Sequence, residues 1–173
     1  MQTISENYRK QQEKLHENPN YGVASVQFAP MVSRLVNQTG VTELLDIGAG
    51  KCRLFQNLKA DHEMKLQAYD PAIQELSDEP TPMQMTTCID VLEHIEPNLL
   101  DNFLDFLKEK TLEVGFFTVH TGAAVKVLDD GRNAHLTQEP AEWWLPKLMS
   151  RFELQSFQKT EAGFFVVMTA KDY

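Results

Sequence analysis

The sequence predicts an α/β domain of three layers, in which a mostly parallel sheet is covered by helices on both faces. Short apolar runs with strand character alternate along the chain with segments whose apolar residues have helical spacing. The runs are continuously apolar, as expected for strands that are buried on both faces of a parallel sheet. The last two runs predict a closing antiparallel hairpin. The strands are predicted at residues 43–47, 65–69, 85–89, 114–119, 152–157 and 164–168.

The segments between these runs predict helices. Residues 4–17 are mostly polar and predict an exposed helix, and a second helix follows with apolar residues at helical spacing until Gly40 ends it. Later helices are expected after three of the strands. Their markers are Leu54 with Leu58, then Pro97 with the apolar stripe of residues 99–107, and finally Trp143, Trp144, Leu148 and Met149.

Composition and charge place the chain among ordinary globular proteins. It has 173 residues, 42% hydrophobic and 24% charged, without repeats or linkers, so residues 1–173 are predicted to form a single domain. The net charge of −9 disfavours the sequence-independent binding of nucleic acid that clustered Lys and Arg provide. Two cysteines, the lack of a signal-peptide core and the lack of a long apolar stretch predict a soluble, cytoplasmic protein without a membrane segment.

A glycine-containing turn follows the first predicted strand, in the sequence LLDIGAGKC. Gly48 and Gly50 let the backbone turn sharply and approach a ligand closely. A dinucleotide-binding fingerprint needs glycine or alanine at position 53, where this chain has Arg53. A P-loop fails as well, because Leu45 stands in place of its first glycine and Cys52 in place of Ser or Thr. Neither phosphate-binding interpretation fits the turn.

Asp46 stands immediately before the glycines, where a carboxylate would repel a pyrophosphate and favour an ammonium or sulfonium group. The run Asp46-Ile47-Gly48-Ala49-Gly50 resembles motif I of class I S-adenosylmethionine-dependent methyltransferases. The resemblance implies a Rossmann-like methyltransferase fold and assigns Asp46, Gly48, Ala49 and Gly50 to the binding of S-adenosylmethionine (SAM). That family usually has another glycine where this chain has Cys52, a departure that we expect to be tolerated if Cys52 packs against the sheet.

A second acidic residue ends the next predicted strand, in Tyr69-Asp70-Pro71. An acid roughly twenty residues after such a glycine turn is placed to accept hydrogen bonds from ribose hydroxyls. The resemblance gives Asp70 the same role, with Pro71 beside it, and the alternative is an exposed acid in a turn. Only residues 72–84 remain before the following strand. The third strand of the fold is therefore expected to be short or missing.

The segment Asp90-Val91-Leu92-Glu93-His94 resembles the one that follows the fourth strand in many of these enzymes. It is expected at the point where ligands bind in open α/β sheets, and we assign Asp90 to cofactor binding and catalysis. If the segment is helical, Asp90, Glu93 and His94 share one face and could hold a divalent cation, Mg²⁺ or Mn²⁺.

A similar ExxEH element binds metal in the small-RNA 2′-O-methyltransferases and in the quinone-biosynthetic O-methyltransferases. The resemblance to the RNA enzymes adds His135 as a fourth ligand. Similar segments also occur in metal-free members of the family, so a metal-free pocket wall remains the alternative. His120 follows the strand at 114–119 and is a candidate general base, with a structural hydrogen-bonding role as its alternative.

These observations predict a SAM-dependent methyltransferase that transfers a methyl group to an oxygen or nitrogen of a small-molecule acceptor. Residues 1–40 are expected to cap the cofactor and acceptor site, and the long polar segment 121–139 to form another wall of it. One alternative is a metal-assisted methyltransferase that acts on a polynucleotide end. Another is a module that binds the cofactor without catalysis. A nucleic-acid partner is not expected in the main interpretation.

Overall fold

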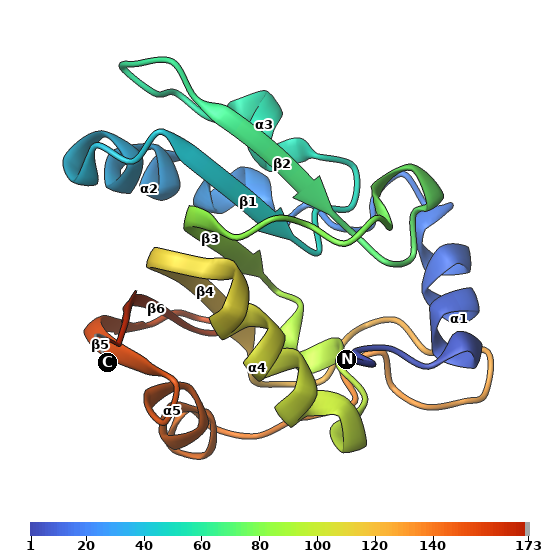
Figure 1. Cartoon of the computed structure of the whole chain (residues 1–173). Helices are drawn as coiled ribbons and strands as arrows, with labels where there is room; N and C mark the ends of the chain where they lie inside the picture. Colours follow the sequence, from blue (N-terminus) through green and yellow to red (C-terminus); the bar gives the residue numbers. More distant parts are fainter. Residues whose placement is uncertain (172–173) are drawn as a thin grey trace.

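The computed structural model describes residues 1–171, in which six strands form one mixed sheet (Figure 1). The strands are β1 (Glu43–Ile47), β2 (Lys65–Tyr69), β3 (Met83–Ile89), β4 (Thr111–His120), β5 (Phe152–Lys159) and β6 (Gly163–Ala170). They lie in the order β2-β1-β3-β4-β6-β5; the first four are parallel, and β6 is antiparallel to both of its neighbours, β4 and β5. This confirms the predicted α/β class, the mostly parallel sheet and the antiparallel C-terminal hairpin.

The connection from β2 to β3 contains a single turn of 3₁₀ helix, η1 (Gln74–Leu76), and no strand among the described residues. The prediction that the third strand of the fold would be short or missing is therefore confirmed. Its absence leaves β2 as an edge of the sheet, which is why Leu66 on that strand is 40% exposed. β1 has β2 on one side and β3 on the other, so the ligand-binding switch point of such a sheet lies at its carboxyl end.

Helices cover both faces of the sheet, which gives the three predicted layers (Figure 1). Alternate residues of one strand enter different clusters, because successive side chains of a strand point to opposite faces. The helices are α1 (Glu6–His16), α2 (Ala24–Thr39), α3 (Arg53–Asn57), α4 (Leu100–Lys110) and α5 (Ala141–Met149), with 3₁₀ turns η2 (Leu92–His94) and η3 (Pro97–Leu99). Leu44 and Phe116 pack with α2 and α3, whereas Leu45 and Phe117 pack with α4 and α5.

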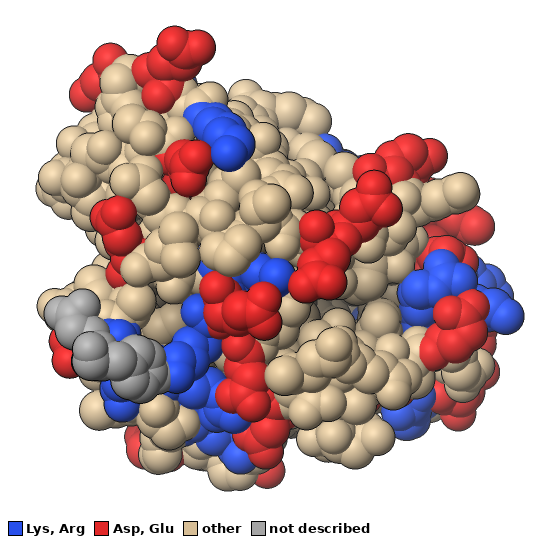
Figure 2. Space-filling model, in the orientation of Figure 1, with Lys and Arg blue, Asp and Glu red and all other residues tan. Residues whose placement is uncertain are grey.

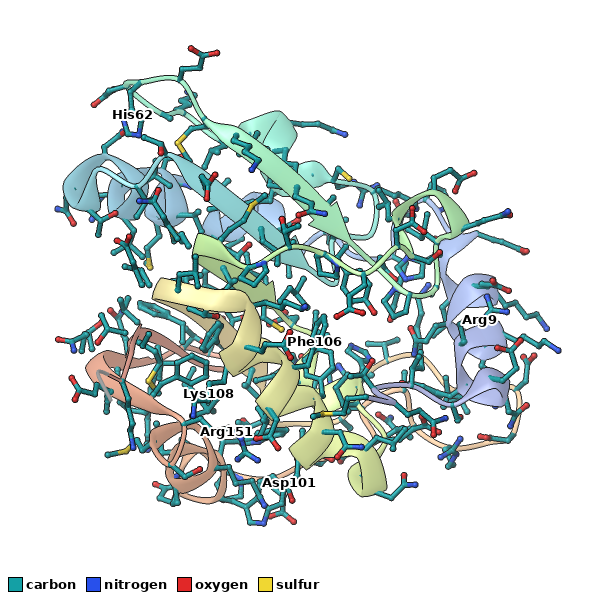
Figure 3. All side chains as sticks on the ribbon, in the orientation of Figure 1. Arg9, His62, Asp101, Phe106, Lys108 and Arg151 are labelled. Atoms are coloured by element: carbon teal, nitrogen blue, oxygen red, sulfur yellow. The ribbon has the colours of Figure 1, made fainter. Side chains whose placement is uncertain are left out.

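Arg151 connects the two helices that share one face of the sheet. It follows α5, and its side chain reaches Asp101 and Asp105 on α4, with nitrogen–oxygen distances of 3.3 and 2.6 Å. Figure 3 shows Arg151 and Asp101 side by side at this junction. The guanidinium group is mostly covered by protein, so the pair fixes the C-terminal part of the chain against the helical layer.

Helix α1 lies away from both sheet faces and packs against the long segment 121–139 (Figure 1). Tyr8, Leu128 and Ala134 form a third, smaller hydrophobic cluster, and Lys14 pairs with Asp129 at 3.0 Å. The prediction that α1 would be an exposed helix is therefore wrong for one side of it, where Tyr8 is 3% exposed. No helix among residues 1–171 is long and apolar enough to cross a membrane.

Candidate active site

A cavity of about 270 Å³ opens at the carboxyl ends of the parallel strands. Its floor comes from the ends of β1, β2 and β3, and its roof from α1 and the segment that leads into α2. All of the residues that the sequence assigned to the cofactor line this cavity. They are Asp46, Gly48, Ala49, Gly50, Asp70, Pro71 and Asp90.

The turn after β1 is fixed by backbone hydrogen bonds to the end of β2. The N–H groups of Gly48 and Ala49 both donate to the carbonyl oxygen of Tyr69, at 2.8 and 3.0 Å. Gly48 has a φ of +78°, and a Cβ at this position would collide with the side chain of Val91. Glycine is required here for two reasons, a left-handed backbone and close packing between the β1 and β3 loops.

Cys52 occupies the position at which the resembling family has another glycine. Its φ is +56° and its ψ is +31°, a left-handed conformation that a residue with a Cβ adopts at a cost of about 1 kcal/mol. The side chain is half-buried beside the turn. The left-handed backbone, which glycine adopts without strain, distinguishes this position.

Asp70 connects the glycine turn to the end of β2. One carboxylate oxygen, Oδ2, accepts a hydrogen bond from the N–H of Gly50 at 3.0 Å, and Oδ1 accepts one from Ala72 at 3.0 Å. Only 5% of Asp70 is exposed, and it lines the cavity. The alternative of an exposed acid in a turn is contradicted, because this carboxylate is buried and held in one orientation.

Asp46 is buried below the turn, where the hydroxyl of Thr87 donates to its Oδ1 at 2.7 Å. Burial is the main reason that the pKa of Asp46 is raised to about 7; the Thr87 hydrogen bond opposes this shift and the nearby charge of Asp70 adds to it. The carboxylate therefore changes its charge close to neutral pH, immediately beneath the cavity.

The segment after β3 is not the α-helix on which the shared face of Asp90, Glu93 and His94 depended. Asp90 has a φ of +51°, and only Leu92–His94 form a 3₁₀ turn. The backbone N–H of Asp90 donates to the hydroxyl of Thr118 at 2.8 Å, and that hydroxyl donates to Asp90 Oδ1 at 2.6 Å. These bonds fix Asp90 to the end of β4, in a position where it still lines the cavity.

Three of the four predicted metal ligands nevertheless converge. One ligand atom from each of Glu93, His94 and His135 lies within 4.8 Å of the other two, and Asp90 is outside the group. The Nδ1 atoms of His94 and His135 pair with the carbonyl oxygens of Ala134 and Gly122, at 2.8 and 2.7 Å. A carbonyl oxygen can only accept, so both Nδ1 atoms carry the proton and both Nε2 atoms are available as ligands.

Glu93 is the buried acid of this cluster. Its Oε1 accepts a hydrogen bond from the backbone of His120 at 3.2 Å, whereas its buried Oε2 has no hydrogen-bond partner among the described residues. Burial, followed by the charge of Asp90, raises the pKa of Glu93 well above its usual value. Burial also lowers the pKa of His94 to about 4. Burial therefore disfavours the charged form of both side chains.

His120 lies behind the cavity and is not among the residues that line it. Its ring centroid is 4.6 Å from that of His135, which does line the cavity. The Nδ1 atom of His120 accepts a hydrogen bond from the N–H of Gly122 at 3.2 Å. His135 thus lies between the cavity lining and the ring of His120 as its nearest imidazole neighbour.

Helix α1 supplies polar residues to the cavity that sequence reasoning missed. Tyr8, Gln12 and His16 all line it, at a spacing of four residues that places them on one face of the helix. Gln12 donates to the hydroxyl of Tyr8 at 2.7 Å, and that hydroxyl donates to the carbonyl oxygen of His94. The spacing of four residues between these side chains was the feature of the sequence that could have indicated a shared helix face toward the site. Tyr21, which belongs to the segment 1–40 that was expected to cap the site, also lines the cavity.

No known sequence family matches the chain, and neither does any curated protein sequence. Solved structures do match. A 1,6-didemethyltoxoflavin-N1-methyltransferase from Burkholderia thailandensis, solved with 1,6-didemethyltoxoflavin and S-adenosylhomocysteine, covers 99% of this chain and 92% of its own, at 16% identity and a TM-score of 0.64. DhpI, solved in a complex with SAH, covers 96% of this chain and 98% of its own, at 17% identity and a TM-score of 0.60.

The small RNA methyltransferase HEN1 is also similar, at 12% identity and a TM-score of 0.59 over 85% of this chain. The matched region is 25% of the HEN1 chain, so this chain corresponds to about a quarter of that protein. The fold of the chain is the Rossmann-like fold of SAM-dependent methyltransferases. The resemblance found in the sequence is confirmed at the level of fold.

Proposed function

We propose that the chain is a SAM-dependent methyltransferase. The observation that carries this proposal is the Asp70 carboxylate, which is buried, faces the cavity and is hydrogen-bonded to the Gly50 end of the glycine turn at 3.0 Å. A carboxylate in this position accepts hydrogen bonds from the hydroxyls of a ribose. We assign cofactor binding to the seven residues predicted from the sequence, namely Asp46, Gly48, Ala49, Gly50, Asp70, Pro71 and Asp90.

The residues around the cavity suit methyl transfer to an oxygen or nitrogen. When bound, SAM supplies a methyl group on a positively charged sulfur, and the acceptor loses a proton as its lone pair forms the new bond. Asp46 and Asp90 offer negative charge to a sulfonium group in a partly enclosed site. Asp90 and His135 face the cavity and can accept the proton. We propose that His120 acts through His135, since only His135 reaches the cavity.

We propose a small molecule as the acceptor. The cavity of about 270 Å³, with residues of α1 in its lining, is small compared with the sizes usual for ligand sites. Basic side chains on the face in Figure 2 are interspersed with acidic ones, which does not favour a phosphate backbone. We further propose a reducing, cytoplasmic location, supported by the two cysteines, both of them free. Residues 1–40 are proposed to cap the site, within one domain.

Methyl transfer from radiolabelled SAM tests the proposal. Purified protein is incubated with small-molecule, RNA and protein fractions of a cell extract, and label is expected in the small-molecule fraction. Asp90→Ala and His120→Ala should lose turnover more than cofactor affinity. Asp130→Asn, a change at an exposed residue of the 121–139 segment, should retain both. Cofactor binding without transfer to any fraction would support the non-catalytic module instead.

A metal-assisted reaction on a polynucleotide end is the second candidate, favoured by the cluster of Glu93, His94 and His135. The cluster fits a divalent cation in that Glu93 has a buried oxygen without a hydrogen-bond partner among residues 1–171 and each imidazole can present Nε2. A cation there could polarise an acceptor hydroxyl. Asp90 does not belong to this set, so three residues of the chain would hold the ion.

Calorimetric titration with MnCl₂ tests this second candidate. We expect His135→Ala to abolish a binding signal that His62→Ala, a change far from the cluster, retains. A wild-type protein that gives no signal with Mn²⁺ or Mg²⁺, and whose activity a chelator leaves unchanged, would contradict the metal. Glu93, His94 and His135 would then be a metal-free part of the pocket wall.

A further inference from the structure

His16, the last residue of α1, lies beside the Asp70 carboxylate. Its Nε2 atom is 3.7 Å from Asp70 Oδ2, the oxygen that accepts the Gly50 hydrogen bond, and both residues line the cavity. This distance is longer than a hydrogen bond, so the two polar groups face each other without a direct bond. They come from elements far apart in the sequence, α1 and the end of β2.

Contacts from two directions hold His16 in this place. Its ring packs edge-on against the ring of Tyr21, with 5.1 Å between the centroids. On the other side, the ring lies over Gly50, where an added Cβ would be 3.6 Å from its Cε1 atom. The backbone carbonyls that follow α1 accept hydrogen bonds from the side chains of Lys51, in the turn before α3, and Arg53, its first residue.

The position of the imidazole suits a hydrogen bond to an uncharged hydroxyl. His16 is mostly enclosed, with 16% of its side chain exposed. Burial is the main influence on its pKa and lowers it, although the charge of Asp70 acts in the opposite direction. A neutral imidazole carries one N–H donor and one acceptor nitrogen, and a hydroxyl can match either. A carboxylate oxygen offers two lone pairs, so Asp70 Oδ2 can accept a second hydrogen bond besides that from Gly50.

We propose that His16 is a further cofactor-binding residue, which recognises the ribose diol of SAM together with Asp70. Two adjacent hydroxyls would bridge the gap between the two side chains, one donating to the carboxylate and the other bonding the imidazole. This inference rests on the proposed function, because it concerns the same cavity. The role of His16 goes beyond the proposed function because it assigns part of the cofactor site to α1. Binding of the cofactor would then also secure α1 over the cavity.

Ligands that lack a single hydroxyl distinguish this role from a structural one. We would measure by calorimetry the affinities of S-adenosylhomocysteine (SAH) and of its 2′-deoxy and 3′-deoxy analogues. The wild type should prefer SAH to both analogues. His16→Ala should bind SAH about 3- to 10-fold more weakly, as expected for the loss of one neutral hydrogen bond. It should also lose its preference for one of the two hydroxyls, which a general loosening of the site would not do.

Two further variants control for damage to the fold. His16→Gln keeps a polar side chain of similar reach and should retain part of the preference. His62, labelled in Figure 3, hydrogen-bonds the carbonyl oxygen of Val41 and lies outside the cavity lining. His62→Ala should bind all three ligands as the wild type does.

The outcomes separate this inference from the proposed function. If both His16 variants prefer SAH over the two analogues as strongly as the wild type does, the role of His16 is overturned and the cofactor assignment stays intact. A wild-type protein that binds none of the three would overturn both. Selective loss of one preference in His16→Ala supports the inference.

Discussion

Thr118 and Asp90 fix each other at the carboxyl ends of two adjacent strands. The Thr118 hydroxyl accepts the backbone N–H of Asp90 and donates its own proton to Asp90 Oδ1, at 2.8 and 2.6 Å. A single hydroxyl thus satisfies both the main chain and the side chain of a residue whose φ is +51°. This arrangement explains why Asp90 lines the cavity and yet stays apart from the cluster of Glu93, His94 and His135.

The first prediction tests this pair with Thr118→Val, which keeps the size of the side chain but removes the hydroxyl. The Asp90 N–H then loses its partner, and we expect the free energy of unfolding to fall by about 1–3 kcal/mol. Affinity for SAH should fall as well, because Asp90 is no longer held toward the cavity. Urea denaturation and calorimetry would measure the two effects. Thr118→Ser keeps the hydroxyl and should stay close to the wild type; equal effects in both variants would contradict the account.

The second prediction concerns the backbone strain at Cys52. Because this residue has a φ of +56°, Cys52→Gly should stabilise the protein by about 0.5–1 kcal/mol. Cys52→Val introduces a branched side chain into the same conformation and should destabilise it. Chemical denaturation should show that the free energy of unfolding decreases in the order Cys52→Gly, wild type, Cys52→Val. The reverse order would show that side-chain packing, and not the backbone, decides this position.

The third prediction separates the two reasons for glycine at position 48. Gly40 has a φ of +72° with open space around it, whereas Gly48 has a φ of +78° and lies against Val91. Gly40→Ala should therefore cost only the backbone strain, about 1 kcal/mol. Gly48→Ala should cost more and should also greatly weaken SAH binding, since the turn must move away from Val91. If Gly40→Ala and Gly48→Ala lose similar stability and Gly48→Ala still binds SAH as the wild type does, close packing against Val91 is not a reason for glycine at position 48.

The fourth prediction follows from the buried carboxyl of Asp46. In the unfolded chain this group ionises near pH 4, but burial raises its folded-state pKa to about 7. The folded protein therefore holds a proton that the unfolded chain has lost, so this contribution to stability is full below pH 4 and declines as pH rises to about 7. Asp46→Asn cannot ionise and should remove that decline, about 1 kcal/mol or more across the window.

The difference between wild type and Asp46→Asn isolates this group from all others that titrate. Urea denaturation at pH 4.5, 5.5, 6.5 and 7.5 should show the wild type losing stability relative to the variant as pH rises. A constant difference between the two proteins over this range would mean that Asp46 does not titrate there.

The sheet was predictable because short runs with strand character alternate with helical segments along the chain, and β1 and β2 have the predicted limits. The glycine turn and Asp70 were predictable because their chemistry depends on residues close in sequence to a strand end. The course of the segment from Asp90 to His94 was not, because Thr118, twenty-eight residues away from Asp90, determines where Asp90 points. The spacing of Asp90, Glu93 and His94 favoured a shared face of an α-helix, and that helix does not form.

The contribution of α1 was harder to foresee for a similar reason. Its composition is polar, and the burial of Tyr8 and Gln12 depends on contacts with the segment 121–139 and with His94. His135 was identified from its resemblance to a known ligand set, and the structure brings it to His94 with 4.7 Å between the ring centroids. His120 was placed correctly at a strand end, but which side of the site it would face depended on β4 and Glu93.

Calorimetric titration of SAH into the wild type and into Asp70→Ala decides whether this cavity is a SAM site. We expect SAH to bind the wild type with one site per chain. Asp70→Ala should lose at least tenfold in affinity, because a charged hydrogen-bond acceptor for the ribose is removed. Asp78→Ala changes an exposed acid in the following loop and should bind as the wild type does. A wild-type protein that binds NAD but neither SAH nor SAM would contradict the account.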